Sequence, residues 1–331
     1  MASGKILRQL IKAGSHGDVI AFKQVSEAII REERQKQHHL LANDLERILY
    51  GDNIRQSSAI RQFSEHIPID QERGLPLLFV REPGRNLDEV VLSKENRGGL
   101  DEILEQHHRA DVLKSYGLRP SDKILFFGPP GCGKTLTAEA LATELERTLA
   151  VIRMDSVVSS YLGETAANLR KVFDFIDSSP MVALFDEFDA LGKEREDSTD
   201  HGELKRVVNA VLQMFDSYQG KSLIIAATNH EQMLDSAIWR RFEEVFFFNP
   251  PTRDELIQLL QIKLRGVRRD FEVTDDQILS IFVKMSHAEV EKILRRAIKE
   301  MILKGQEFLQ IRLIKKAMQR EQAQKHVSKR R

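Results

Sequence analysis

The segment GPPGCGKT, residues 128–135, is the strongest constraint on what this chain can fold into. It follows a short apolar run, Ile124–Phe127, and precedes a helical pattern from Leu136 to about Glu146. A strand, a glycine-rich loop and a helix in this order form the phosphate-binding pattern G-x-x-x-x-G-K-S/T. The glycines let backbone N–H groups turn inward around phosphate oxygens, and the helix N-terminus adds partial positive charge. The sequence therefore predicts an α/β nucleotide-binding domain.

The polar residues that end this loop carry its predicted chemistry. Lys134 can reach the β- and γ-phosphates of a nucleotide, and the Thr135 hydroxyl can bind Mg²⁺. Cys132 is the one cysteine of the chain, so no intrachain disulfide forms, and both a redox switch and a filler residue fit its position. The predicted nucleotide-binding residues are Gly128, Pro129, Pro130, Gly131, Cys132, Gly133, Lys134, Thr135, Leu136 and Asp186.

Two further apolar runs end in polar residues. Met181–Phe185 precedes Asp186 and Glu187, and Leu223–Ala227 precedes a threonine and Asn229. We expect Asp186 to hold Mg²⁺ through water and Glu187 to polarise the attacking water as general base. Asn229 could orient the same water. Adjacent residues of a strand point to opposite faces, so the two acidic residues need not share one role.

Composition narrows the class of protein. Fifty basic residues balance fifty acidic ones among 331, which argues against a broad electrostatic footprint for nucleic acid. No apolar run approaches the roughly 20 residues of a membrane span. Lys5, Arg8 and Lys12 interrupt the amino terminus, so no signal peptide is expected. These features predict a cytoplasmic chain that does not bind membrane, and they argue against nucleic acid as a partner.

The order of these motifs resembles the AAA+ ATPases, and within them the AAA clade of protein-remodelling machines that includes spastin, katanin and FtsH. The resemblance covers roughly residues 88–320. GPPGCGKT is similar to the Walker A motif, ALFDEFDAL at 183–191 to Walker B, and AATN at 226–229 to sensor 1. LDSAIWRRFEEVFFFNPP at 234–251 is similar to the second region of homology.

The resemblance implies an ATP hydrolase with ATP and Mg²⁺ as cofactors, working as a homo-oligomeric ring, a hexamer. Its catalytic residues would be Glu187, Asn229 and two arginines, Arg240 and Arg241, which in the family project into the neighbouring subunit's ATP site. Such an arginine accelerates phosphoryl transfer by about 10³–10⁵ in related enzymes. Two surface arginines that cap a helix are the structural alternative.

A second match, SSYLGETAANLRKVF at 159–173, implies a loop that lines a central pore. Tyr161 and Leu162 would grip an extended polypeptide, with Gly163 allowing the turn, because aromatic side chains bind with little sequence preference. A hydrophobic contact at a helix start is the alternative. The sequence contains no H-E-x-x-H or G-x-S-x-G motif, so degradation would need a separate peptidase or adaptor chain.

Three classes of function stay open at this point. The first is an ATP-dependent protein-unfolding motor with chaperone-like activity. A nucleic-acid motor or loader would use the same ATP chemistry, but the balanced charge and the Tyr161 triplet argue against it. A nucleotide-gated scaffold would assemble without processive work.

The predicted fold is α/β, a five-stranded, mostly parallel P-loop NTPase sheet with a helical lid and a small helical amino-terminal domain. The domains are 1–67, helical; 68–250, the AAA+ nucleotide-binding domain; and 251–331, the lid and a basic tail. Leu77–Val80 and Val90–Leu92 are candidate short strands. The lid helices are predicted at Asp254–Leu264, Asp275–Met285, Ser286–Lys304 and Gln306–Arg320. SHAEV at 286–290 resembles the family's S-G-A-D-I/L with His287 in place of glycine, and an adenine pocket would involve Val91–Leu92 and this helix.

Overall fold

The computed structural model describes residues 67–157, 162–190, 213–230 and 239–328, together with Val25, Ser26, Ile29 and Gln232. Contacts divide the chain into two compact units, residues 1–66 and 67–331. The predicted helical domain at 1–67 lies almost entirely outside the described residues, and the boundaries at 67/68 and 250/251 stay predictions.

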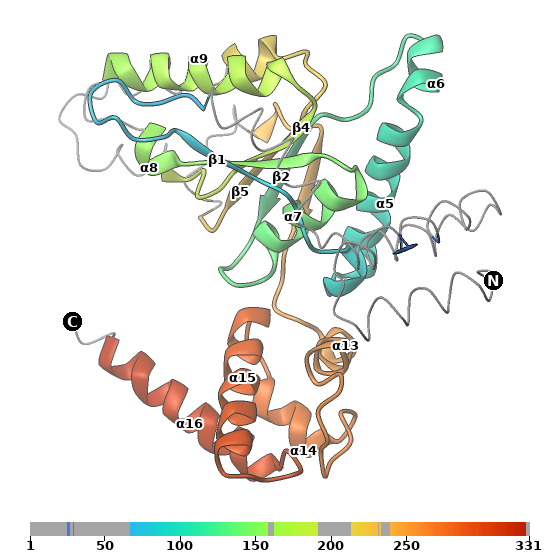
Figure 1. The fold of residues 1–331 in the computed structure, drawn as a ribbon, viewed down its shortest axis with the longest axis vertical. Coiled ribbons are helices and arrows are strands. Elements are labelled where there is room, and N and C mark those ends of the chain that lie inside the picture. Colours follow the sequence, from blue (N-terminus) through green and yellow to red (C-terminus); the bar gives the residue numbers. More distant parts are fainter. Residues whose placement is uncertain are drawn as a thin grey trace. The chain divides into compact units, whose positions relative to one another are not determined.

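A mixed sheet forms the centre of the α/β part (Figure 1). Its strand order is β1-β3-β4-β5-β2-β6, in which β1 runs antiparallel to β3 and every other neighbouring pair is parallel. This mostly parallel sheet flanked by helices confirms the predicted α/β class. The strands are β1 Leu78–Arg81, β2 Lys123–Phe127, β3 Thr148–Ile152, β4 Met181–Phe185, β5 Leu223–Thr228 and β6 Glu244–Phe247.

The sheet has six strands, so the prediction of five was wrong. Val90–Leu92 is not a strand, because the Val90 N–H closes a 3-10 turn onto the Leu87 carbonyl, 3.2 Å away. The sequence analysis did not single out β3 and β6. The signal was present at both, because Leu149–Ile152 and Val245–Phe247 are continuous apolar runs.

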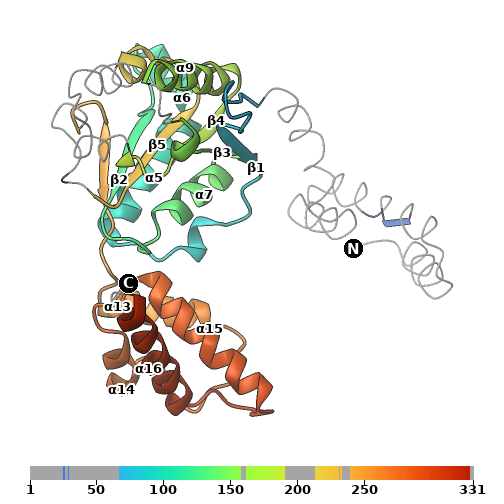
Figure 2. The ribbon, with the colours of Figure 1, turned by 90° about the vertical axis from the view of Figure 1, so that its left-hand side faces the viewer.

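Helices cover both faces of the sheet, which explains why β4 is buried along its whole length. Helices α7 (Lys134–Glu144) and α9 (Leu162–Ser178) lie on opposite faces (Figure 2). Side chains alternate along β4: Val182 and Leu184 join the core cluster that includes Leu141 of α7, whereas Phe185 packs on Phe173 of α9, with 5.7 Å between ring centroids. The α7 face of β4 is therefore the face shared with the phosphate loop.

Helix α5 (Lys94–His108) packs against the edge strand β6. The Asn96 side-chain amide donates to the Phe247 carbonyl at 2.9 Å, and Gly99 lies so close to Phe246 that a Cβ there would be 2.7 Å from the ring. The short helices α6 (Ala110–Ser115) and α8 (Met154–Val157) follow α5 and β3. Residues 213–217 are also helical.

The carboxyl-terminal helices share a core of their own, made of residues such as Leu260, Ile278, Leu294 and Ile314, which agrees with the predicted helical lid. They are α13 Arg253–Lys263, α14 Asp276–Leu279, the 3-10 turn η3 Ser280–Phe282, α15 His287–Leu303 and α16 Ile311–Ser328. The single helix predicted at Asp275–Met285 is instead α14, η3 and a turn. Lys284 has a φ of +63°, which no right-handed helix accommodates.

None of the helices in the described part of the chain combines the length and the hydropathy that a membrane span requires.

Two adjacent glycines of α5 provide a test of this packing. Gly98 has open space around it, so Gly98→Ala should raise the free energy of unfolding by about 0.5–1 kcal/mol through helix propensity. Gly99→Ala should lower it by about 1–3 kcal/mol, because the new methyl group meets the buried Phe246 ring. Urea unfolding measures both. Equal stabilisation by the two variants would contradict the packing of α5 on β6.

Candidate nucleotide site

One cavity of about 500 Å³, here called the phosphate cavity, brings together most of the residues predicted to act on a nucleotide. From the loop it is lined by Pro130, Gly131, Gly133, Lys134, Thr135 and Leu136, and from the strand ends by Asp186, Glu187 and Asn229. Its remaining lining residues are Arg85, Glu89, Val90, Val91, Glu139, Leu259, Lys263, His287, Ala288 and Glu291. The cavity therefore lies between the carboxyl ends of β2, β4 and β5 and the helices α13 and α15.

The loop at the end of β2 needs its glycines. Gly128, Gly131 and Gly133 have positive φ angles of 131°, 76° and 103°, which L side chains rarely adopt. A Cβ on Gly128 would lie 2.3 Å from the Phe248 carbonyl oxygen, and one on Gly131 would lie 2.9 Å from Ser286 Oγ. The loop is thus pressed against the end of β6 on one side and the start of α15 on the other.

Lys134 is held inside this loop. Its Nζ donates to the Gly128 carbonyl at 2.6 Å and to the Pro129 carbonyl at 3.0 Å, and the residue is only 6% exposed. Burial lowers the pKa of the Lys134 ammonium, and the neighbouring Asp186 and Asp189 carboxylates oppose that shift. The ammonium is a partly desolvated donor whose two carbonyl partners hold it at the loop.

Thr135 and Asp186 meet across the cavity. The Thr135 hydroxyl donates to Asp186 Oδ2 at 2.8 Å, although the two residues are 51 positions apart. A hydroxyl and a carboxylate side by side are oxygen ligands of the kind Mg²⁺ binds. The pair fits the ion that the sequence predicts there.

Glu187 does not follow the strand alternation that the sequence analysis used. It has a φ of +51°, in the left-handed region, and its N–H donates to Asp186 Oδ1 at 2.9 Å. The strand ends at Phe185, and both acidic residues lie in the turn that follows and line the same cavity. Asn229, at the end of the neighbouring strand β5, also lines it.

Asp189 is a residue of this site that the sequence analysis missed. It is 1% exposed, and its Oδ1 accepts from the Thr228 hydroxyl at 3.1 Å. Thr228 Oγ1 in turn accepts from the His230 N–H at 3.0 Å, so the two sides of Asn229 are tied to the turn after β4. The signal was present in ALFDEFDAL, where an acidic residue recurs three positions after Asp186.

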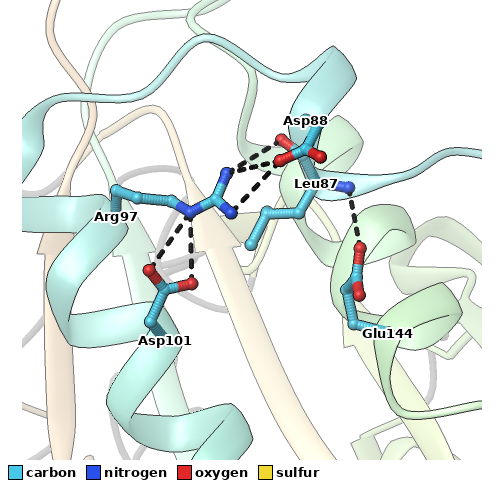
Figure 3. A network of polar contacts seen from close by, with 5 residues as sticks. All are labelled: Leu87, Asp88, Arg97, Asp101 and Glu144. Atoms are coloured by element: carbon cyan, nitrogen blue, oxygen red, sulfur yellow. Dashed lines mark hydrogen bonds and ion pairs between the residues drawn. The ribbon is translucent and has the colours of Figure 1, made fainter.

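The segment that leads into Val90 and Val91 is fixed by a polar network around the 3-10 turn η1, Leu87–Glu89 (Figure 3). Arg97 of α5 bonds to Asp88 at 3.2 Å and to Asp101 at 3.1 Å. From the other side, Glu144 of α7 accepts from the Leu87 N–H at 3.1 Å. This network connects the wall of the cavity to the helix that begins with Lys134.

A second cavity of about 280 Å³, here called the inner cavity, adjoins this segment. Cys132 lines the inner cavity and not the phosphate cavity, and Leu92 does the same. Cys132 is 2% exposed, and burial raises the pKa of its thiol, which keeps the thiol protonated and unreactive. Of the two roles that the sequence leaves open for Cys132, the structure therefore favours a residue that fills space in the loop over a redox switch.

Arg240 and Arg241 do not line the phosphate cavity of their own chain. Arg241 pairs with Asp216 through Nε at 3.1 Å and Nη2 at 3.0 Å. Arg240 is exposed and has no partner among the described residues. The preceding Trp239 packs edge-on against Phe127, with 5.1 Å between ring centroids, which anchors the pair of arginines to the end of β2.

The predicted pore loop falls mostly outside the described residues. Tyr161 is not described, and α9 begins at Leu162 and Gly163, whose side chains are likewise not described. Their role stays a prediction.

The comparisons with known proteins point in one direction. Residues 124–250 match the family described as "ATPase family associated with various cellular activities (AAA)". An uncharacterized AAA family ATPase, y4kL of Sinorhizobium fredii, is 40% identical over 321 residues, which cover 97% of this chain and 96% of that protein. Protein SAV of Sulfolobus acidocaldarius is 32% identical over 213 residues, 60% of this chain and 27% of that protein.

The contact between Thr228 and Asp189 yields a test of the site's rigidity. Thr228→Val removes the hydroxyl and leaves the buried Asp189 carboxylate and the His230 N–H without this partner. We expect a loss of about 1–3 kcal/mol in the free energy of unfolding. Thr228→Ser keeps the hydroxyl and should retain the protection of the His230 amide in hydrogen exchange, which Thr228→Val should lose. Equal protection in the two variants would show that the hydroxyl does not hold this turn.

Proposed function

We propose that this chain, which belongs to the AAA family of ATPases, binds ATP with Mg²⁺ in the phosphate cavity and hydrolyses it to remodel protein as a homo-hexameric ring. One observation carries the ATPase part of the proposal. A single cavity collects the loop lysine and threonine, two carboxylates and an asparagine from three neighbouring strands. This donor set suits phosphoryl transfer to water.

Lys134 and Thr135 bind the triphosphate. Lys134 exchanges its two carbonyl partners for β- and γ-phosphate oxygens, and the N–H groups at the start of α7 face the same anion. When bound, Mg²⁺ would be held by Thr135 and Asp186 and would neutralise charge on the phosphates.

Glu187 is the proposed general base. Its carboxylate takes a proton from the water that attacks the γ-phosphorus, while the Asn229 amide orients that water. The new oxygen–phosphorus bond forms as the bond to the β-phosphate oxygen breaks, and ADP leaves. The Asp189–Thr228 contact keeps Asn229 beside the turn that carries Glu187.

Arg240 completes the site of a neighbouring subunit in this proposal. It is exposed, has no partner in the described part of the chain and lies away from its own phosphate cavity. Arg241, by contrast, is held by Asp216, so we assign it to positioning of the turn that carries Arg240. This assignment chooses between two arginines that the sequence alone does not distinguish.

Remodelling requires that the ATP site move the pore loop at Tyr161. Helix α9 follows that loop, and its Phe173 packs on Phe185, the residue before Asp186. A change at Asp186 could therefore be transmitted to α9, the helix that follows the pore loop, through the contact between Phe185 and Phe173. The helical domain at 1–67 would bind substrate or partner, and a separate peptidase or adaptor chain could act with the ring.

Two substitutions test the ATPase chemistry. Lys134→Ala should abolish ATP binding, because it removes the cation at the phosphates. Glu187→Gln should bind ATP but lose about 10²–10⁴-fold in turnover, because it removes the base. Equilibrium binding of a fluorescent ATP analogue and phosphate release measure the two properties. Glu102→Gln, an exposed change on α5, is the matched control. Normal turnover by Glu187→Gln would assign the base elsewhere.

A mixing experiment tests completion of the site in trans. Turnover per subunit should rise with protein concentration, and Arg240→Ala should lower it by about 10³-fold or more. Arg240→Ala subunits mixed with Glu187→Gln subunits should regain activity, since some interfaces then combine an intact Glu187 with a neighbour's intact Arg240. Arg241→Ala should lose less. Full activity of the Arg240→Ala variant would contradict the assignment, and so would mixtures that stay inactive.

A further inference from the structure

Arg85 lines the phosphate cavity, and the chemistry described above gives it no role. It lies in the irregular segment between β1 and the 3-10 turn η1. Before this segment β1 is paired with β3, and after it the polar network around Leu87 and Asp88 holds the chain (Figure 3). The backbone that carries Arg85 is therefore anchored at both ends, whereas its side chain is 46% exposed and has room to move.

The charges around the phosphate cavity show why a movable cation matters there. Among the described residues that line it, five side chains are carboxylates and three are lysine or arginine. The carboxylates are Glu89, Glu139, Asp186, Glu187 and Glu291, and the cations are Arg85, Lys134 and Lys263. A triphosphate is itself an anion, so its binding in this cavity needs cations that can exchange their present partners for phosphate oxygens.

Arg85 is the most weakly held of the three cations. Lys134 Nζ donates to two loop carbonyls at 2.6 and 3.0 Å, and Lys263 Nζ lies 2.6 Å from Glu291 Oε2. Arg85 Nε lies 4.0 Å from Glu139 Oε1, and Glu139 is its one ionic partner in the described part of the chain. An ion pair of that length with a half-exposed arginine contributes little to stability, so an entering phosphate can displace it.

Glu139 keeps a partner when Arg85 leaves. Arg81 of β1 donates from Nη2 to Glu139 Oε2 at 3.1 Å, and Arg81 does not line the cavity. The exchange therefore leaves no carboxylate unpaired. Glu139 also lies one turn beyond Leu136 on α7, and both residues line the cavity. Arg85 is thus placed beside the helix whose first N–H groups would face the phosphates.

We propose that Arg85 binds the polyphosphate of the nucleotide held by its own chain: its guanidinium leaves Glu139 and donates to phosphate oxygens, while Glu139 stays with Arg81. The planar guanidinium, with its several N–H donors, suits two oxygens of a phosphate. The inference rests on the proposed function, because it assumes that ATP occupies the phosphate cavity. It gives the site a second cation from the same chain, beside Lys134 and distinct from an arginine of the neighbouring subunit.

Binding of ATP and of inorganic tripolyphosphate to the purified full-length chain, measured by calorimetry with Mg²⁺ present, tests the proposal. Both affinities should fall about ten- to a hundredfold in Arg85→Ala, because a hydrogen bond between charged groups is lost. Arg85→Lys keeps the charge but not the planar fork, so its loss should be smaller. Arg81→Ala is the matched control. It removes the other arginine that pairs with Glu139, outside the cavity, and should change either affinity by less than about threefold.

Glu139→Gln tests the exchange of partners. In the wild-type background it should tighten tripolyphosphate binding about two- to fivefold, because Arg85 then has no competing carboxylate. In the Arg85→Ala background the tightening should be smaller, since the guanidinium that benefits is absent. Equal tightening in the two backgrounds would show that Glu139 does not hold Arg85 away from the phosphates.

Three further results would overturn the inference. Equal losses in Arg85→Ala and Arg81→Ala would show that these arginines only hold the β1 segment against α7. A loss of ATP affinity with full tripolyphosphate affinity would place Arg85 at the base or the ribose. Unchanged affinities for both would show that Arg85 contacts neither. A wild type that binds neither ATP nor tripolyphosphate would instead contradict the proposed ATPase function, whatever the variants do.

Discussion

The parallel pairing of β4, β5 and β2 is the constraint on which the rest of the site depends. Its register pairs Phe185 with Ala226, and Phe127 with Thr228. Polar residues that directly follow these strands therefore meet at one edge of the sheet, where open α/β folds bind their ligands. A slip of one residue would turn every side chain of a strand to the other face. In β4 the slip would move Val182 and Leu184 out of the core cluster that includes Leu141 and Phe185 away from Phe173, so the fit of these side chains fixes the chemistry at the strand end.

A second constraint joins the lid to the loop. The Gly131 carbonyl accepts from Ala288 of α15, and a side chain at Gly131 would strike Ser286. The lid helix thus contacts the loop backbone directly, without an intervening side chain. The same loop would enclose the phosphates. A movement of the loop when phosphates bind would therefore be transmitted directly to the lid helix, and the cavity between them would change shape.

The local motifs were predictable because the residues that define them are consecutive in the sequence. The loop at 128–135 and the acidic residues after β4 needed only a strand and a turn to take their positions. Long-range packing was not predictable. Strand β6 exists because β2 offers it an edge, the Leu87 N–H finds its acceptor in Glu144 of α7, and Asp189 acquires its partner Thr228 from a strand 39 residues further along the chain. Such features depend on tertiary contacts that no short pattern encodes.

The turn at Glu187 combines a local motif, which was predictable, with a backbone conformation, which was not. Strand alternation alone would place Asp186 and Glu187 on opposite faces, yet both line one cavity. The difference comes from a left-handed residue, which costs free energy in a non-glycine side chain. The Glu187 N–H bond to Asp186, the Phe188 N–H bond to the Ala227 carbonyl and the Ala190 N–H bond to Glu187 offset that cost. A glycine would adopt this conformation without strain, whereas the glutamate at this position places a carboxylate in the wall of the cavity.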